Sequence, residues 1–188
     1  KWPDLIQLVK YNQFDTIYHD HFSYLSFTIV YEIFKKQGLE LFHVEEISTH
    51  GGSIRIFGKH IEDSSRKRRE SVNLLLHKEN EAGVNSIDYY KGFQKRVEKV
   101  KFEFLKFLLN AKVEGNKVAA YGAAAKGNTL LNYSAVKADM IDFVVDAAPI
   151  KQHKFLPGSH IPVVTEDKIK EQKPDYIIIF PWNIKEEI

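Results

Sequence analysis

The sequence predicts a mixed α/β fold, in which a helix and an antiparallel hairpin precede a mostly parallel sheet. The sheet is predicted by short apolar runs that alternate with a helical segment in the second half, joined by short connections. The hairpin is predicted by two strand-like runs on either side of Gly51-Gly52. A chain of 188 residues, of which 44% are hydrophobic, is also long and apolar enough to bury a core.

The first half begins with a helix followed by the hairpin. Ser23 is the candidate N-cap of a helix that runs to about Lys36, and Gly38 provides its stop signal. Residues 41–47 and 53–58 form the two strand-like runs, and the turn between them is short enough for antiparallel pairing.

Helices are expected again between the hairpin and the second half. Ser64 or Ser65 would cap a segment that ends at Gly83, and Ser86 would cap a long helix after it. The basic run at 66–69 is interpreted as the solvated first turns of a helix. The long helix carries an apolar stripe at spacings of three and four, which favours a core position over a site. The stripe consists of Tyr90, Phe93, Val97, Val100, Phe104, Leu108 and Ala111.

Strands and helices alternate in the second half. We predict strands at 117–121, 141–145 and 176–180, a helix from Asn128 onward between the first two, and a further strand from Pro162. Because ligands of parallel sheets bind beyond the carboxyl ends of the strands, the residues after each strand are candidate site residues. They are Gly122, Asp146 and Trp182.

The composition narrows the function classes. Basic and acidic residues nearly cancel, 27 against 25, so the chain lacks the long-range field that gathers nucleic acid or an anionic membrane. No apolar run reaches about 18 residues, the length of a membrane span. The absence of cysteine excludes disulfides and thiol catalysis and fits a reducing compartment. We expect a cytoplasmic protein, and the start at Lys1 without an initiator methionine indicates a fragment.

The run YGAAAKGNT at 121–129 has the glycine spacing of a phosphate-binding loop. Gly122 and Gly127 match GxxxxG, but Asn128 stands where a nucleotide-hydrolysing loop has lysine. The structural alternative is a tight strand-to-helix turn in which the alanines allow close packing. Lys126 and Asn128 favour an anion or a diphosphate that is bound but not cleaved. The candidate substrate-binding residues of this loop are Gly122, Lys126, Gly127, Asn128 and Thr129.

The run IYHDHFSYLS at 17–26 concentrates titratable side chains. If residues 18–21 are extended, Tyr18 and Asp20 face one way and the two histidines face the other. Histidine can act as a base near neutral pH, and an adjacent carboxylate could fix its tautomer. Two alternatives stay open: a metal site built on the histidines, or polar histidines at the end of a helix cap. We assign no metal, because no further ligand is evident.

Ordered motifs along the chain resemble one enzyme family. The runs IYHDHFSYLS, THGGSIRIF, YGAAAKGNTLLNY, VVDAAPIKQHKFLPGSHIPV and PDYIIIFPWNIKEEI resemble the S-adenosylmethionine-dependent C-methyltransferases that act on nucleotide-linked deoxysugars. The resemblance covers nearly the whole chain. It implies that residues 1–60 are the C-terminal part of a methyltransferase domain, 61–115 a helical connection, and 116–188 a Rossmann-like C-terminal domain.

The resemblance also implies parts outside this chain. The family's cysteine-rich zinc domain and the glycine loop that holds S-adenosylmethionine would precede Lys1. Zinc is therefore expected only in that missing domain, and this piece is not expected to bind the methyl donor well by itself. Two motifs depart from the family pattern: Asp20 stands where glutamate is usual, and Ala147-Ala148 replaces an Arg-Asn pair. The second change removes a cation and an amide from that loop.

The implied chemistry is C-methylation through an enolate. His21 would take the proton from a sugar carbon beside a 4-keto group, and the enolate carbon would then displace the methyl group from the sulfonium. Asp20 and Tyr18 would orient the base or bind the sugar. The C-terminal part would recognise the nucleotide-diphosphate sugar and could also form a homodimer. Its further candidate contacts are Lys151, His160, Trp182 and Asn183.

Two alternatives come from other function classes. A binding or dimerisation module would hold a nucleotide sugar without catalysis, with His21 incidental. An NAD-dependent oxidoreductase would use the run at 118–127 as its cofactor loop and Asp146 on the ribose, but this loop lacks the GxGxxG spacing. The stretch LPGSHIP at 156–162 also has a purely structural interpretation, with a turn at Pro157-Gly158.

Overall fold

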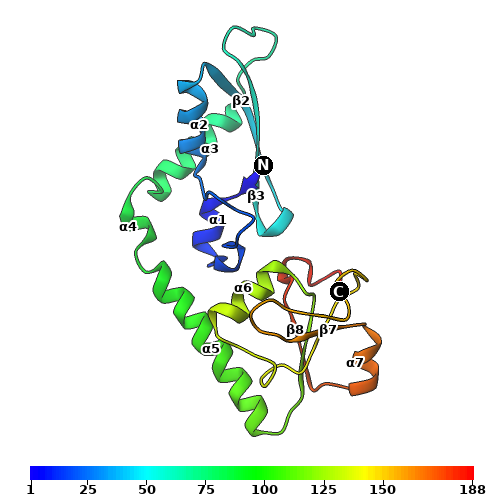
Figure 1. Ribbon diagram of the computed structural model, residues 1–188. Helices are drawn as coiled ribbons and strands as arrows, with labels where there is room; N and C mark the ends of the chain where they lie inside the picture. Colours follow the sequence, from blue (N-terminus) through cyan, green and yellow to red (C-terminus); the bar gives the residue numbers. More distant parts are fainter. The chain divides into compact units, whose positions relative to one another are not determined.

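The computed structural model describes residues 1–188, which divide into two compact units. Unit 1 comprises Lys1–Phe14 and Asp20–Gln94, and unit 2 comprises Asp15–His19 and Lys95–Ile188 (Figure 1). The short stretch Asp15–His19 thus belongs to unit 2, although the chain on both sides of it belongs to unit 1. None of the helices combines the length and the apolar character that a membrane span requires.

Unit 1 is built on a three-stranded antiparallel sheet with the order β1-β3-β2. β2 (Leu39–Ile47) and β3 (Ser53–His60) form the predicted hairpin, so this prediction is confirmed. β1 (Trp2–Pro3) pairs with the other edge of β3. The helices of the unit are α1 (Leu5–Lys10), α2 (Phe27–Lys36), α3 (Glu70–Ala82) and α4 (Ile87–Tyr90), and a 3-10 turn at Thr49–Gly51 lies inside the hairpin.

The core of unit 1 lies where α2 and α3 pack against β2 (Figure 1). Phe27 of α2, Leu41 of β2, Ile54 of β3 and Val72 of α3 are fully buried there. Complete burial of such a side chain contributes about 1.5–3 kcal/mol. Packing of these residues therefore stabilises helices that are too short to be stable alone.

α2 begins later than predicted. Its N-cap is Ser26, which has an extended backbone and accepts a hydrogen bond from the Ile29 N–H at 3.2 Å. Ser23, the predicted cap, is exposed and lies outside any helix or strand. Because several serines and threonines in this stretch are suitable caps, sequence alone does not select among them.

α3 also begins later than predicted and ends where predicted. It starts after Arg69 without a side-chain cap, so neither Ser64 nor Ser65 begins it. Gly83 adopts a left-handed φ of 78° directly after the helix, which confirms the stop signal.

The long helix predicted from Ser86 is broken. Ser86 caps only the short α4, and α5 (Phe93–Val113) is a separate helix. Gly92 lies between them with a φ of 81°, a value incompatible with a continuous right-handed helix. The apolar stripe continues across this break, so periodicity alone does not reveal it.

Unit 2 contains the predicted mostly parallel sheet, with five strands in the order β6-β7-β5-β4-β8. All neighbouring strands pair in parallel except β6, which runs antiparallel to β7. The strands are β4 (Val118–Tyr121), β5 (Val144–Val145), β6 (Lys154–Phe155), β7 (Pro162–Val164) and β8 (Tyr176–Ile179). The helices are α5, α6 (Ala125–Tyr133) and α7 (Asp167–Gln172), with a 3-10 turn at Trp182–Ile184.

Helices cover both faces of this sheet. Ala120 of β4 packs in a cluster with Leu108 of α5 and Leu131 of α6. Ala119, which precedes Ala120 in β4 and faces the other side of the sheet, belongs to a cluster with Ile169 of α7. β4 is therefore buried on both sides, as its unbroken apolar sequence indicates.

Three details of unit 2 correct the sequence prediction. α6 begins at Ala125 and not at Asn128. The strand predicted at 141–145 is shortened to Val144–Val145, because Ile141 is buried in the core without joining the sheet. The antiparallel strand β6 was not predicted, since its two residues are both exposed and carry no strand pattern.

Candidate functional site

The order in which strands are added to the sheet of unit 2 reverses at β4. The chain forms β5 on one side of β4 and later β8 on its other side. In parallel sheets, ligands bind at such a switch point, beyond the carboxyl ends of the strands. The loop after β4, Asp146 after β5 and Pro181 after β8 meet at this edge, as the contacts below show.

The two glycines of the loop are required by close packing. A Cβ atom on Gly122 would lie 2.6 Å from Cδ of Pro181, and the φ of this glycine is 86°. A Cβ atom on Gly127 would lie 2.4 Å from Cγ of Phe180. Both distances are shorter than any tolerated contact between carbon atoms. The glycine spacing is therefore explained by the approach of the loop and α6 to the end of β8, which is the structural alternative considered above.

The carboxylate of Asp146, which follows β5, lies against the inner side of the loop after β4. Oδ2 accepts hydrogen bonds from the Ala123 N–H at 2.7 Å and from Nζ of Lys151 at 3.0 Å. Oδ1 accepts from the Ala148 N–H at 2.9 Å. Burial raises the pKa of Asp146, but the hydrogen bonds from Ala148, Lys151 and Ala123 outweigh it, so the pKa lies below its ordinary value. Lys151, a predicted substrate contact, is thus paired with a carboxylate of the loop.

Lys126 is the buried cation of the site. Only 8% of it is exposed, and its Nζ lies 4.3 Å from the centre of the Trp182 ring. The same atom donates a hydrogen bond to Oδ1 of Asn183 at 3.2 Å. Burial lowers the pKa of Lys126, and the carboxylate of Asp15 opposes this shift. The structure therefore brings together three predicted contacts, one from α6 and two from the turn after β8.

Asp15 joins this cluster although no sequence motif pointed to it. The indole N–H of Trp182 donates a hydrogen bond to Oδ2 of Asp15 at 2.7 Å, across 167 positions of sequence. Asp15 precedes the run of titratable residues at 17–26 and belongs to unit 2. No sequence pattern relates a carboxylate to a tryptophan so far away in the chain, so the sequence offers no signal for this contact.

The first turn of α6 has no side-chain cap. Its N-cap, Ala124, has no side chain that could accept a hydrogen bond from the helix. Backbone N–H groups at such a helix end favour negative charge. Asn128 is already in the helix and its N–H donates to the carbonyl of Ala124 at 3.0 Å, while the Thr129 hydroxyl donates to the carbonyl of Ala125 at 3.1 Å.

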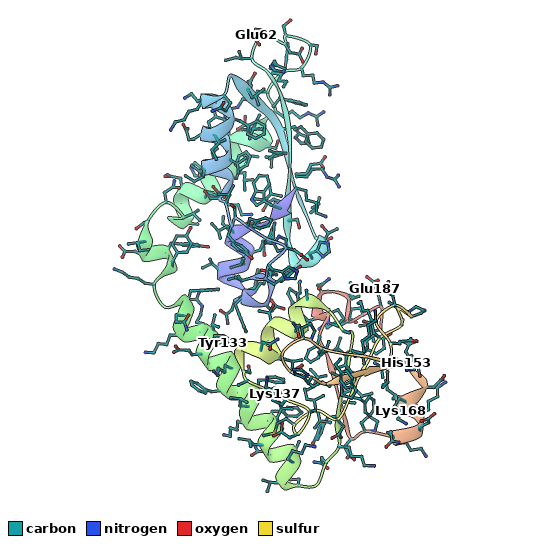
Figure 2. The ribbon with its side chains drawn as sticks, in the orientation of Figure 1. Glu62, Tyr133, Lys137, His153, Lys168 and Glu187 are labelled. Atoms are coloured by element: carbon teal, nitrogen blue, oxygen red, sulfur yellow. The ribbon has the colours of Figure 1, made fainter.

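His160 lies away from this turn of α6. It follows the turn at Pro157-Gly158, which Asn132 holds by donating a hydrogen bond to the Pro157 carbonyl at 3.0 Å. Lys137, which is labelled in Figure 2 and follows α6 in the chain, donates a hydrogen bond to the Gly158 carbonyl. The turn therefore contacts the C-terminal half of α6, about 10 Å along the helix from its first residue. The structure does not bring His160 into the cluster around Lys126.

The run at 17–26 is irregular. Residues 18–21 form a bend and a turn, so the extended arrangement considered above does not occur. His21 is partly buried with its ring 6.1 Å from that of Tyr24, and the rings of Tyr18 and His19 are 6.3 Å apart. The chain passes from unit 2 to unit 1 between His19 and Asp20, within the predicted catalytic group.

Cavities lie elsewhere in both units, and two of them are next to the sheets. One of about 580 Å³ is at the amino ends of β4, β5 and β7, lined by residues such as Lys117, Asp142 and Pro162. The predicted contacts lie at the carboxyl ends of the strands, where ligands of parallel sheets bind. This cavity lies at the opposite ends, so we do not choose it as the candidate site. One of about 340 Å³ in unit 1 is lined by residues such as Asp4 and Ser53. Burial raises the pKa of Asp4, although the Ile6 and Gln7 N–H groups bind its carboxylate.

Comparison with known proteins identifies relatives over nearly the whole chain. The profile of the family described as "C-methyltransferase C-terminal domain" matches residues 48–188. The protein named "C-methyltransferase NovU" of Streptomyces niveus is 35% identical over 186 residues, which are 99% of this chain and 44% of that relative. The chain therefore spans less than half the length of this relative.

Proposed function

The chain belongs to the C-methyltransferase C-terminal domain family, and we propose that it is the C-terminal portion of an S-adenosylmethionine-dependent enzyme that methylates a carbon atom of a nucleotide-linked keto-deoxysugar. The observation that carries this proposal is the 35% identity to a named C-methyltransferase over 99% of the chain. Because the chain covers 44% of that relative, the reaction is a property of the complete enzyme.

His21 is the proposed general base. A carbon–carbon bond requires a carbanion equivalent, and a C–H next to a ketone becomes acidic enough once the enolate is stabilised. His21 would take this proton, and the enolate carbon would bond to the methyl carbon as the bond from that carbon to the sulfonium sulfur breaks and the thioether leaves. Asp20 and Tyr18 orient the imidazole or hold the sugar. S-adenosylmethionine supplies the electrophilic methyl group.

The glycine turns of this chain do not fit the methyl donor. Gly52 lies in the hairpin turn, where a Cβ atom would meet Cγ of Gln7 at 2.8 Å. The loop after β4 is filled by Pro181 and by the carboxylate of Asp146. We propose that the donor is bound by the upstream part of the complete enzyme, and that zinc belongs to a domain outside this chain.

Unit 2 is the proposed recognition part for the nucleotide-diphosphate sugar. Numbered in order along the chain, the parallel strands are arranged 3-2-1-4, which matches the first four positions of the Rossmann order 3-2-1-4-5-6. The anion would sit at the open first turn of α6, where Lys126 and Asn183 converge and Trp182 offers a ring for stacking. An arriving phosphate compensates the desolvated Lys126, and no bond to phosphorus is broken.

An NAD-dependent oxidoreductase is the weaker alternative. In that reading Asp146 would bind the cofactor ribose. Both carboxylate oxygens instead accept hydrogen bonds from Ala123, Ala148 and Lys151. Three of the roughly four acceptor sites of this carboxylate are thus used within the protein, which leaves little for a ribose hydroxyl. The binding module without catalysis is tested by the experiment described next.

Replacing the base tests the function. In the complete enzyme, we expect His21→Ala to lower the methylation rate by about a hundred- to ten-thousand-fold, as is typical for loss of a general base. Binding of the nucleotide-linked sugar, measured by calorimetry, should change little, since the proposed anion site lies in unit 2. His77→Ala is the matched control, because His77 is exposed on α3 and pairs with Glu81. Near-normal turnover of His21→Ala would reject His21 as the base. Sugar binding by the unaltered complete protein without any methylation would instead favour the binding module.

A further inference from the structure

We propose that Glu79 is a positioning residue for the segment that carries His21. Its carboxylate fixes the start of α2, directly after that segment. The inference rests on the proposed function, in which His21 is the base.

The carboxylate of Glu79 caps a helix from a distance. Glu79 lies near the end of α3 and is fully buried. Its Oε1 accepts a hydrogen bond from the Phe27 N–H at 2.7 Å, across 52 positions of sequence. Its Oε2 accepts from the Thr28 N–H at 2.7 Å and from the Thr28 hydroxyl at 2.6 Å.

These bonds complete the first turn of α2. The first N–H groups of a helix have no partner within the helix. Glu79 takes those of Phe27 and Thr28, and the Ser26 side chain takes that of Ile29. A carboxylate at this end of a helix also interacts favourably with the helix dipole. Glu79 therefore fixes the beginning of α2 to α3. The Ser26 side chain alone would form hydrogen bonds only within the first turn of α2.

The segment before α2 depends on this anchor. Between Asp20 and Ser26 the chain forms no helix or strand. Its last part is held by the Trp2 indole, which donates a hydrogen bond to the Leu25 carbonyl at 2.8 Å, and then by Glu79. His21 lies six residues before Phe27 in an otherwise irregular stretch. The position of the imidazole therefore depends in part on where α2 begins.

Burying a carboxylate costs free energy that an ordinary helix cap does not require. An ionised group loses its hydration when buried and must be compensated by hydrogen bonds, which here come from three donors. A serine N-cap, already present at Ser26, stabilises a helix without this cost. The added feature that Glu79 supplies is a fixed connection between α3 and the end of the segment at 17–26.

Glu79→Gln would weaken this connection while keeping its shape. An amide has one acceptor oxygen and one NH₂ group. Whichever way the amide is turned, its NH₂ faces an N–H of Phe27 or Thr28, so a donor opposes a donor. The beginning of α2 should shift or open locally, and His21 should lose its alignment with the sugar carbon.

The test is steady-state kinetics of the complete enzyme, well below its unfolding temperature. We expect Glu79→Gln to lower kcat about tenfold, since small misplacements of a reacting group cost up to about a hundredfold. KM for the nucleotide-linked sugar should stay within about twofold, because the interaction lost acts on the chemical step. Glu81→Gln is the control on the same helix, where Glu81 is exposed and pairs with His77. Amide hydrogen exchange at Phe27 and Thr28 should be faster in Glu79→Gln.

A second variant tests the inference even if Glu79→Gln does not fold. Thr28→Val keeps the side-chain shape and both backbone N–H bonds to Glu79 but removes the hydroxyl donor. We expect it to lower kcat in the same direction by about twofold to threefold. If Glu79→Gln does not fold, this smaller effect decides, and an unchanged kcat overturns the inference.

The outcomes separate the two proposals. A loss of activity in His21→Ala together with a normal kcat in Glu79→Gln and Thr28→Val overturns the positioning role and leaves the proposed function intact. Lower thermal stability of these variants without a change in kcat means that Glu79 is only structural. Near-normal turnover of His21→Ala overturns the role of His21 as base and, with it, this inference, whereas the absence of methylation by the unaltered complete enzyme overturns the proposed function.

Discussion

At the scale of single residues, the carboxylate of Asp146 shapes the loop after β4. It accepts hydrogen bonds from two backbone N–H groups and from Lys151, so the loop is built around an internal anion. In the proposed function, an external phosphate would instead bind at the first turn of α6, where Lys126 contacts the Trp182 ring. The loop thus separates an internal carboxylate from the proposed ligand site.

Asp146→Asn should destabilise the chain in a pH-dependent way. Loss of a charged acceptor that serves several donors costs about 1–3 kcal/mol. The folded pKa of Asp146 is depressed below 3.8, so its stabilisation is present above that value and is lost as the pH falls through the folded pKa. Urea unfolding of both proteins at neutral pH and at about pH 2 measures this difference. It should be clear at neutral pH and small in acid.

Asp139→Asn is the matched control for this experiment. Asp139 is an exposed carboxylate in the connection between α6 and β5. Its replacement should leave the free energy of unfolding nearly unchanged at both pH values. A difference between Asp146→Asn and the original chain that is the same at both pH values would contradict the assigned role of the charge.

At the scale of elements, β8 is an uncovered edge of the sheet in unit 2. It pairs with β4 on one side only. Its side chains are apolar, and Ile177 and Ile179 are 43% and 37% exposed. Phe107 of α5 packs against Tyr176 at the beginning of the strand. An exposed apolar edge is a template for pairing with another strand.

We expect this edge to promote self-association of the isolated chain. Ile177→Lys should reduce concentration-dependent association, because a charged side chain on an edge opposes pairing. Leu74→Lys is the control, since Leu74 is 63% exposed on α3 in the other unit. Analytical ultracentrifugation over a range of concentrations compares the two. Equal effects of both variants, or none, would mean that β8 is not the contact.

At the scale of the whole molecule, each unit has its own core. Unit 1 is centred on the hairpin with α2 and α3, and unit 2 on the sheet with α5, α6 and α7. A separate hydrophobic core is the condition for independent folding. The stretch Asp15–His19 is the exception, because it belongs to unit 2 but is connected to unit 1 at both ends.

Residues 95–188 alone should therefore fold. We expect a single cooperative thermal transition by circular dichroism. The piece retains Trp182 as its only tryptophan, of two in the chain, and lacks its acceptor Asp15. The full chain with Asp15→Asn is the comparison for Trp182 fluorescence. A broad transition with exposed apolar surface in the isolated piece would show that unit 2 needs residues 15–19 to fold.

Features encoded within a few neighbouring residues could be predicted. The two strand-like runs on either side of Gly51-Gly52 predicted the hairpin, Gly83 predicted the end of α3, and the unbroken apolar run predicted β4. By contrast, the predicted cap of α2, Ser23, is wrong, and the sequence patterns do not predict the break at Gly92. Both features depend on residues outside the local pattern, since any of several serines can cap and glycine is tolerated in helices.

The sequence by itself determined the mixed α/β class, the order of the elements and, through its motifs, the family. Only the tertiary structure decided which side chains meet. Phe27 and Glu79 are 52 positions apart, Ala123 and Asp146 are 23 apart, and Trp182 and Asp15 are 167 apart. Periodicity reports how a segment contacts its immediate neighbours. The partners of a buried carboxylate or cation are set by how distant segments pack, and no local pattern specifies them.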